Sequence, residues 1–304
     1  MHFQLNHRWR KCRLNRKKIK ARAATMKTSG LNKAYQYCRD ITVQHYENFP
    51  VASFLLPASV RKHIYPIYAF ARHADDLADE KQDKAALLDW RKKLHNSVNG
   101  HASHPVFIAL SNTIQRFELP VALFDDLIKA FLQDLEKTQY RDLPELRQYC
   151  NYSANPVGRL ILLLNGYRDD KLFQYSDDIC TALQLTNFWQ DVMIDIGKDR
   201  VYIPESCLAR YGFSRDTIRN KRFDEEFGAM MSELVDETER LFERGRSLLS
   251  HINKRLKWEL KLTIMGGESI LNKIKANDYD VLHFRPKLSK GNWARLAFRS
   301  IFKP

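Results

Sequence analysis

Hydrophobic residues recur with helical period along most of the chain from Tyr35 onward, and stretches that alternate apolar and polar residues are nearly absent. Short breaks rich in polar residues, proline or glycine separate these segments, as at Pro57, Pro120 and Gly166. Such a period is typical of amphipathic α-helices. The pattern predicts helices near residues 32–46, 58–80, 83–98, 105–117, 120–138, 144–165, 171–196, 216–251 and 256–276.

No repeat, flexible linker or low-complexity tract divides this series, which therefore predicts a single all-α domain over residues 31–285. Of the 304 residues 44% are hydrophobic, enough for a large core. The 11 glycines and 10 prolines are too few for an all-β fold with many turns. The five cysteines show neither a disulfide framework nor zinc-ligand spacing, which fits a reducing cytoplasm.

The formal net charge of +14 first suggests a polyanionic partner, but the charge lies at the two ends of the chain. Residues 1–30 hold ten Lys or Arg and residues 281–304 hold six, and neither segment contains an acid. The remaining 34 basic residues are matched by 36 acidic ones. This near-neutral body argues against a nucleic-acid-binding module.

Both basic ends allow more than one interpretation. Residues 1–30 form a basic extension that resembles an organellar transit sequence, and a start at Met26 would leave residues 1–25 out of the protein. Residues 286–304 form a basic amphipathic tail, expected to lie on an anionic membrane surface or to pack on the body with a solvated basic rim. No apolar run reaches the length that spans a bilayer. The apolar face of the tail would contain Trp293, Leu296, Ala297 and Ile301.

Two predicted helices carry acids where core-forming helices should be apolar. In the first, Tyr68, Arg72, Asp75 and Asp79 share one helix face. Asp75 and Asp79 are one turn apart, and this like-charge pair costs stability unless a cation lies between the two carboxylates.

The second acidic stripe consists of Asn187, Asp191 and Asp195, spaced four residues apart among apolar neighbours. Oxygen ligands of this kind suit Mg²⁺, which bridges carboxylates to substrate phosphates. Two facing stripes would hold a diphosphate at the mouth of an apolar cavity. A solvated acidic face is the alternative for either stripe alone, and it is the interpretation we give to the acidic pairs at 125–126, 169–170 and 177–178, which lack an acidic partner four residues away.

At this point the chain resembles a known family, the squalene and phytoene synthases, which are all-α class I prenyl-transferring synthases. The resemblance runs from about Tyr35 to Arg285, and Arg200 and Tyr202 follow the second acidic stripe at the family spacing. Its motifs are His45-Tyr-Glu-Asn-Phe with Leu55-Leu-Pro57, Tyr68-x3-Arg72-x2-Asp75-Asp-x2-Asp79, Tyr149-Cys-x2-Ser-Ala-x2-Val-Gly158, Gln184-x2-Asn187-x3-Asp191-x3-Asp195 and Ala276-Asn-Asp-Tyr279.

The resemblance implies a class I isoprenoid synthase fold with a central cavity between antiparallel helices. Two or three Mg²⁺ ions would bind there with the diphosphate through Asp75, Asp79, Asn187, Asp191 and Asp195. Tyr149 and the four aspartates would be the catalytic residues. The substrate-binding residues would be Tyr46, Tyr68, Arg72, Gln184, Asn187, Arg200, Tyr202 and Tyr279.

Three departures from the family pattern narrow the resemblance. Tyr46 replaces the usual Ser, Gln190 replaces the Arg that precedes the aspartate, and Asn155-Pro156 replaces a Gly-containing pair. With Asn48-Phe-Pro-Val-Ala and Arg285-Pro-x-Leu-Ser289, these features resemble the bacterial hydroxysqualene synthase branch of hopanoid-type squalene biosynthesis.

That branch implies a lyase-type reaction in which presqualene diphosphate and water give hydroxysqualene and diphosphate, with Mg²⁺ and without NADPH. We expect a cytoplasmic enzyme on the inner membrane surface that receives its substrate from other squalene-pathway enzymes. One alternative is condensation of two farnesyl diphosphates to presqualene diphosphate or squalene, or of two geranylgeranyl diphosphates to phytoene. Another is a non-catalytic assembly or binding relative, which the intact aspartates argue against.

Overall fold

The computed structural model describes residues 30–44, 57–289, 291–293 and 295–296. Over this part of the chain the regular structure is helical, apart from one isolated parallel bridge between Gln139 and Val201. The all-α prediction is therefore confirmed. None of the helices in these ranges is long and apolar enough to cross a membrane. Tyr46, most of the basic N-terminal extension and the end of the C-terminal tail lie outside the described residues.

A helix of residues 30–44 precedes the labelled elements. Several of the later helices begin at an Asp or Asn whose side chain accepts a backbone N–H of the first turn, as at Asp83, Asp142, Asp169, Asp224 and Asn253. The elements are α2 (Ala58–Asp79), α3 (Lys84–Val98), α4 (Pro105–Phe117), α5 (Val121–Asp134), α6 (Leu143–Ser153), α7 (Asn155–Leu164), α8 (Asp170–Gln190), α9 (Val192–Gly197), α10 (Glu205–Arg210), α11 (Arg215–Arg219), α12 (Glu225–Gly245), the 3₁₀ helix η2 (Arg246–Ser250) and α13 (Lys254–Lys275).

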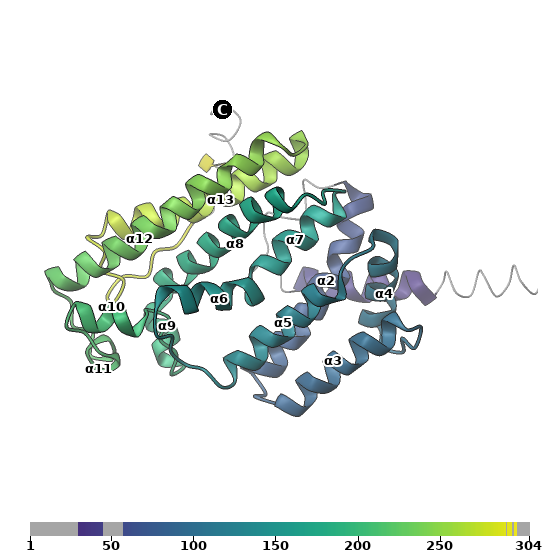
Figure 1. Ribbon diagram of the computed structural model, residues 1–304, viewed down its shortest axis with the longest axis horizontal. Coiled ribbons are helices and arrows are strands. Elements are labelled where there is room, and N and C mark those ends of the chain that lie inside the picture. The colour runs from purple at the N-terminus through teal and green to yellow at the C-terminus, as the bar shows by residue number, and fades with distance from the viewer. Residues whose placement is uncertain (1–29, 45–56, 290, 294, 297–304) are drawn as a thin grey trace, which may run out of the picture.

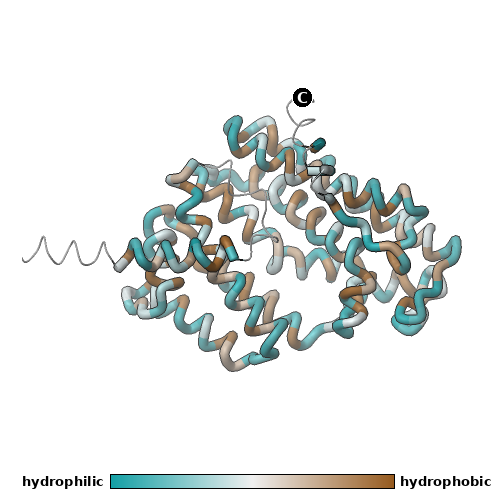
Figure 2. Tube along the Cα trace, turned by 180° about the vertical axis from the view of Figure 1, so that it is seen from behind, coloured by the Kyte–Doolittle hydropathy of each residue, from teal (hydrophilic) through white to brown (hydrophobic). Residues whose placement is uncertain are grey.

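Helix α8 lies in the middle of the molecule, between α12 and α13 on one side and α6 and α7 on the other (Figure 1). Helices α2 to α5 pack together at the far side (Figure 1). Their core includes Phe70, whose ring meets Phe107 and Phe124 edge-on, while Trp189 of α8 is fully buried. Hydrophobic and hydrophilic positions are interspersed along the helical turns (Figure 2), as expected for helices that bury one face.

Four of the predicted helices differ from the observed ones, because one ends earlier and three divide. The helix predicted over 120–138 ends at Asp134, and the one over 144–165 divides at Ala154 because Pro156 lacks the N–H needed to continue it. The helix over 171–196 breaks at Asp191, which no proline or glycine marks. The helix over 216–251 divides because Lys221 has a positive φ of 53° and Asp224 caps a new start.

Helices α8 and α13 run in the same direction, because each is antiparallel to α12. Between α8 and α12, Gly245 lies against Ile179, whereas Trp189 Nε1 donates to Thr238 Oγ1 at 2.9 Å. Between α13 and α12, Arg246 pairs with Glu268, whereas Lys275 binds Glu239 at 2.6 Å. The carboxyl ends of α8 and α13 therefore lie at the same end of the helix layer.

The α8–α12 contact depends on the missing side chain of Gly245. A Cβ there would lie 2.5 Å from Ile179 Cγ1 and 2.9 Å from the Tyr175 carbonyl oxygen, and a backbone atom cannot move aside by changing rotamer. A Cβ on Gly228, in the same helix, would meet only the Asp278 carbonyl oxygen at 3.6 Å.

We therefore expect Gly245→Ala to lower the free energy of unfolding by about 1–3 kcal/mol. The matched variant Gly228→Ala should leave it unchanged or raise it by up to about 1 kcal/mol through helix propensity. Urea unfolding of the two variants and the wild type measures the difference. Equal stability of both variants would show that the close approach at Gly245 is unimportant.

Candidate active site

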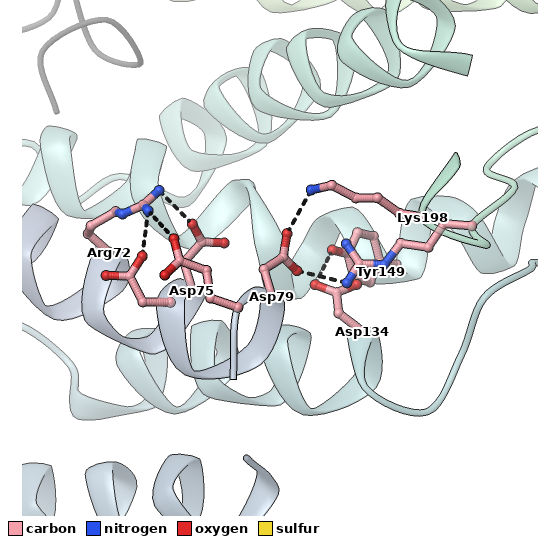
Figure 3. A network of polar contacts seen from close by, with 9 residues as sticks. Arg72, Asp75, Asp79, Asp134, Tyr149 and Lys198 are labelled. Carbon is pink, nitrogen blue, oxygen red and sulfur yellow. Dashed lines mark hydrogen bonds and ion pairs between the residues drawn. The ribbon is translucent and has the colours of Figure 1, made fainter. Parts of the chain in front are cut away.

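The two acidic motifs predicted from the sequence lie next to each other in space. Asp75 and Asp79 occupy the last turns of α2, and Asp191 and Asp195 occupy the break after α8 and the short α9. Arg200, which follows α9, donates to Asp79 at 2.7 Å. Lys198 donates to the other oxygen of the same carboxylate at 3.2 Å (Figure 3). The chain after the second motif is thus tied directly to the first.

The first motif is held by Arg72, one helical turn earlier on α2. Its guanidinium lies 3.1 Å from Asp75 and 2.5 Å from Asp76, as Figure 3 shows for the network around it. Burial, and then the neighbouring Asp79 carboxylate, raise the pKa of Asp75. Burial also raises the pKa of Tyr68, which lies within electrostatic reach of Arg72 and Asp75. The four residues predicted to share this face are therefore together.

The second motif receives a cation from the C-terminal part of the chain. Arg285 contacts both carboxylate oxygens of Asp191, with its Nε at 2.5 Å and its Nη2 at 3.1 Å. Burial, followed by the charge of Asp191, raises the pKa of Asp195 to about 7. The charges of Arg200 and Asp79 also act on the pKa of Asp195, so the two motifs are close enough to interact electrostatically.

The donor atoms of this region fit a hard divalent cation. The side chains are carboxylates and one amide, Asn187. Burial, and after it the charge of a neighbouring carboxylate, raises the pKa values of Asp75 and Asp195, and a divalent cation would neutralise that charge. Within the described ranges, no three His, Cys, Asp or Glu side chains converge as a ready metal-ligand group. Three of the aspartates are instead paired with Arg72, Arg200 and Arg285.

Beside the acidic motifs, the buried Tyr149 of α6 pairs with the half-buried Asp134, the last residue of α5 (Figure 3). The Tyr149 hydroxyl donates to Asp134 Oδ2 at 2.8 Å, and Asp134 Oδ1 has no partner among the described residues. Burial raises the pKa of Asp134 to about 7. Sequence reasoning missed Asp134 because it lacks an acidic partner four residues away. The available signal was a lone acid after Phe131 and Leu132 at the end of an apolar helix.

Aromatic rings surround Tyr149. Tyr202 stacks on Phe188 with ring centroids 3.8 Å apart and planes 10° from parallel, and Tyr149 lies 6.2 Å from each of these rings. Tyr140 completes the cluster at 5.4 Å from Tyr149. Tyr149 and Tyr202, predicted as site residues, are thus brought together, and Tyr140 and Phe188 are additional members.

A cavity of about 530 Å³ opens between α7, α8 and α13. Asn187 and Gln190 line the end of the cavity that we call its acidic end, because they lie just before Asp191 in the chain; the motif aspartates themselves are not among the described lining residues. The other lining residues are mostly apolar, which is typical of a site for a lipid-like ligand. They include Val157, Gly158, Ile161, Leu162, Ile179, Leu183, Leu248, Leu256, Leu260 and Ile270, with Ser176, Cys180, Thr186, Glu259, Thr263, Gly266 and Gly267.

Residues 285–289 and Trp293, which we name the C-terminal strap, cover part of this cavity. Gln190 Nε2 donates to the Pro286 carbonyl oxygen at 2.6 Å, and Lys273 Nζ donates to that of Lys287 at 2.7 Å. Leu288 and Trp293 then line the cavity, with Trp293 over Gly266. Gln190, one of the departures from the family pattern, thus holds the segment that brings Arg285 to Asp191.

Two predicted site residues have other surroundings. Tyr279 lies in the turn after α13, where its hydroxyl accepts a hydrogen bond from Ser232 of α12 at 3.0 Å, and it is not part of the described cavity lining. Gln184 is half-buried on α8, nearly one turn before Asn187. Among the acids predicted to be surface charge, Asp125, Asp177 and Asp178 pair with arginines of neighbouring helices.

Comparisons with known proteins agree with this geometry. The family model for squalene/phytoene synthase matches residues 42–292. A phytoene synthase of Arthrospira platensis is 28% identical over 269 residues, covering 83% of this chain and 87% of that protein. The crystal structure of squalene synthase HpnC from Alicyclobacillus acidocaldarius is 40% identical with a TM-score of 0.80, covering 82% of this chain and 96% of that one. A dehydrosqualene synthase solved in complex with a ligand is 25% identical with a TM-score of 0.82, covering 90% and 96%. The chain belongs to the squalene/phytoene synthase family.

Proposed function

We propose that this enzyme converts presqualene diphosphate and water into hydroxysqualene and diphosphate. The observation that carries the proposal is the apolar cavity that ends at Asn187 and Gln190, just before Asp191, because a site of this kind suits a lipid chain that bears a diphosphate. The first aspartate motif is linked to this end through the ion pair between Arg200 and Asp79. Support for the branch comes from the 40% identity to HpnC, compared with 28% to the Arthrospira phytoene synthase, and from Gln190 at the cavity's acidic end.

Asp75, Asp79, Asn187, Asp191 and Asp195 would hold the magnesium ions. When bound, these ions would neutralise the departing diphosphate. The guanidinium groups that now pair with the aspartates would bind the phosphate oxygens, for which planar bidentate donors are well suited. Arg72, Arg200 and Arg285 are the three arginines in this position.

The chain's own groups would then protect and direct the carbocation. As the bond from carbon to diphosphate oxygen breaks, the electron pair leaves with the diphosphate and the cyclopropane ring opens. The oxygen of a water molecule then adds to the resulting cation, and the proton that this water loses passes to the released diphosphate. The faces of Tyr202 and Phe188 stabilise positive charge, and the Tyr149 oxygen is made more electron-rich because its hydroxyl donates a hydrogen bond to Asp134. The C-terminal strap limits the entry of bulk water.

The decisive experiment supplies the purified protein with Mg²⁺ and presqualene, farnesyl or geranylgeranyl diphosphate, each with and without NADPH. Mass spectrometry of the lipid products should find hydroxysqualene from presqualene diphosphate, independent of NADPH and abolished by EDTA. Presqualene diphosphate or squalene from farnesyl diphosphate, or phytoene from geranylgeranyl diphosphate, would establish the condensing alternative instead. Folded protein without turnover of any substrate would favour the non-catalytic alternative.

Binding to an anionic membrane and substrate handover from other squalene-pathway enzymes stay predictions. In the described part of the tail, Trp293 is half-buried over Gly266 and Leu296 is 7% exposed, so both side chains pack on the body. Arg295 between them is exposed. These contacts support the interpretation of a packed helix with a basic rim, a surface that can still face anionic headgroups.

A further inference from the structure

One carboxyl group in the cavity belongs to neither aspartate motif. Glu259 of α13 lines the cavity and is 4% exposed. Its Oε2 has no hydrogen-bond partner among the described residues. Buried polar atoms are normally paired, so an orphaned carboxyl oxygen at a ligand cavity calls for a functional explanation.

The surroundings of Glu259 keep it neutral. Burial is the sole cause that raises its pKa, to about 8, and no cation in the described structure offsets it. At pH 7 the group is therefore mainly a protonated acid among apolar neighbours such as Leu256 and Leu260. A leucine at this position would avoid the cost of the unpaired polar atom, so the carboxyl does not serve packing.

Glu259 lies at the end of the cavity away from the aspartates. Since α8 and α13 are parallel, the start of α13 lies beside the earlier turns of α8, and Asn187 lies towards the other end. The lining extends from Ser176 to Gln190 on α8, about 21 Å at the helical rise of 1.5 Å per residue. Leu248 of η2 and Leu256 belong to the same far end as Glu259.

We propose that Glu259 closes the far end of the cavity and thereby sets the upper limit on the length of the isoprenoid chain that the enzyme accepts. The inference rests on the proposed function, in which the diphosphate lies at the aspartates and the chain extends along α8. A chain that ends before Glu259 leaves the carboxyl free to bond water. A chain one isoprene unit longer would press apolar carbon onto the carboxyl and remove that water, which lowers affinity about tenfold.

The test measures binding rather than turnover. Isothermal titration calorimetry with Mg²⁺ measures the dissociation constants of farnesyl thiodiphosphate and geranylgeranyl thiodiphosphate. In both analogues the thiodiphosphate is a poor leaving group, so that binding is measured without turnover. The wild type should bind the farnesyl analogue about tenfold more tightly. Glu259→Leu should remove most of this preference by tightening the geranylgeranyl complex, and Glu259→Gln, which keeps a polar group of the same size, should retain it. The control Glu268→Gln changes a carboxyl of α13 that binds Arg246 and is not part of the described cavity lining.

The outcomes separate the two proposals. If both analogues bind the wild type equally, or if folded Glu259→Leu keeps the wild-type preference, the length limit is wrong and the proposed function is unaffected. If neither analogue binds the wild type, the inference fails, because no isoprenoid chain then lies along α8. The proposed function is judged separately, by turnover of presqualene diphosphate. A thermal melt provides an independent readout, because replacing an unpaired buried carboxyl by leucine should raise the Tm.

Discussion

Replacing Asp191 by Asn is expected to lower turnover by about 1,000-fold or more, and Asp75→Asn should have the same effect. Each change removes one negative charge from the oxygen ligands proposed for magnesium, which would weaken magnesium binding and leave the departing diphosphate poorly neutralised. A loss of about 4 kcal/mol in transition-state stabilisation corresponds to this factor. Diphosphate release and lipid product, measured over a range of Mg²⁺ concentrations, report the effect.

The fold should survive both changes. Burial and then repulsion from Asp79 raise the pKa of Asp75, and Asp75→Asn removes both costs of the charged group, so its Tm should equal or exceed that of the wild type. The matched control is Asp178→Asn on α8, which loses only an exposed ion pair with Arg244, worth at most about 1 kcal/mol. This control should keep full turnover. Wild-type rates in Asp191→Asn would show that the acidic stripes are merely solvated faces.

Asp134→Asn should lower turnover by about 100-fold and at the same time raise thermal stability above neutral pH. The variant has no carboxylate to accept the hydrogen bond of the Tyr149 hydroxyl, so the Tyr149 oxygen stabilises positive charge less well. The stability effect follows from the pKa of about 7, which lies above the ordinary value of an aspartate in the unfolded chain. The folded protein binds this proton more tightly, so the stability from the protonated group is present at low pH and is lost as the pH rises through about 7.

The Tm advantage of Asp134→Asn over the wild type should therefore be absent near pH 4 and grow up to about pH 7 or 8. Thermal melts at a series of pH values test this, and a constant difference in Tm would refute it. Tyr149→Phe provides a partner for a double-mutant cycle. Because Tyr149 and Asp134 act as a unit, the double variant should lose little more turnover than either single one.

The residues that could be predicted from the sequence are those whose positions follow from helical period alone. Asp75 and Asp79 share a face with Arg72 whatever the tertiary structure, because residues three, four and seven apart always do. The position of Asn187 on its helix, one turn before Asp191, likewise follows from the spacing of four residues. The regular spacing of Asn187, Asp191 and Asp195 also predicted one continuous helix, whereas the helix breaks at Asp191. No proline or glycine marks this break in the sequence.

The remainder of the site depends on contacts between distant segments. Asp134 meets Tyr149 from another helix, and Arg285 reaches Asp191 from 94 residues away. Periodicity assigns no partner to such residues. The motif match predicts Tyr279 as a site residue, and the hydrogen bond that its hydroxyl accepts from Ser232 is a further contact that periodicity does not indicate. Glu259 was likewise invisible in the sequence, because only the cavity distinguishes it from an ordinary surface glutamate on an amphipathic helix.

The pairing of aspartates with built-in cations has a consequence for how substrate arrives. Arg72, Lys198, Arg200 and Arg285 offset the charges of the carboxylates that they contact, so the resting entrance has little excess charge of either sign. An entrance of this kind exerts only a weak long-range pull on charged molecules. In the proposed function, substrate loading would be an ion exchange, in which the carboxylates would release the arginines and bind metal while the arginines would bind phosphate. Capture of a lipid diphosphate therefore depends on contact between its apolar chain and the cavity wall, and should change little with ionic strength.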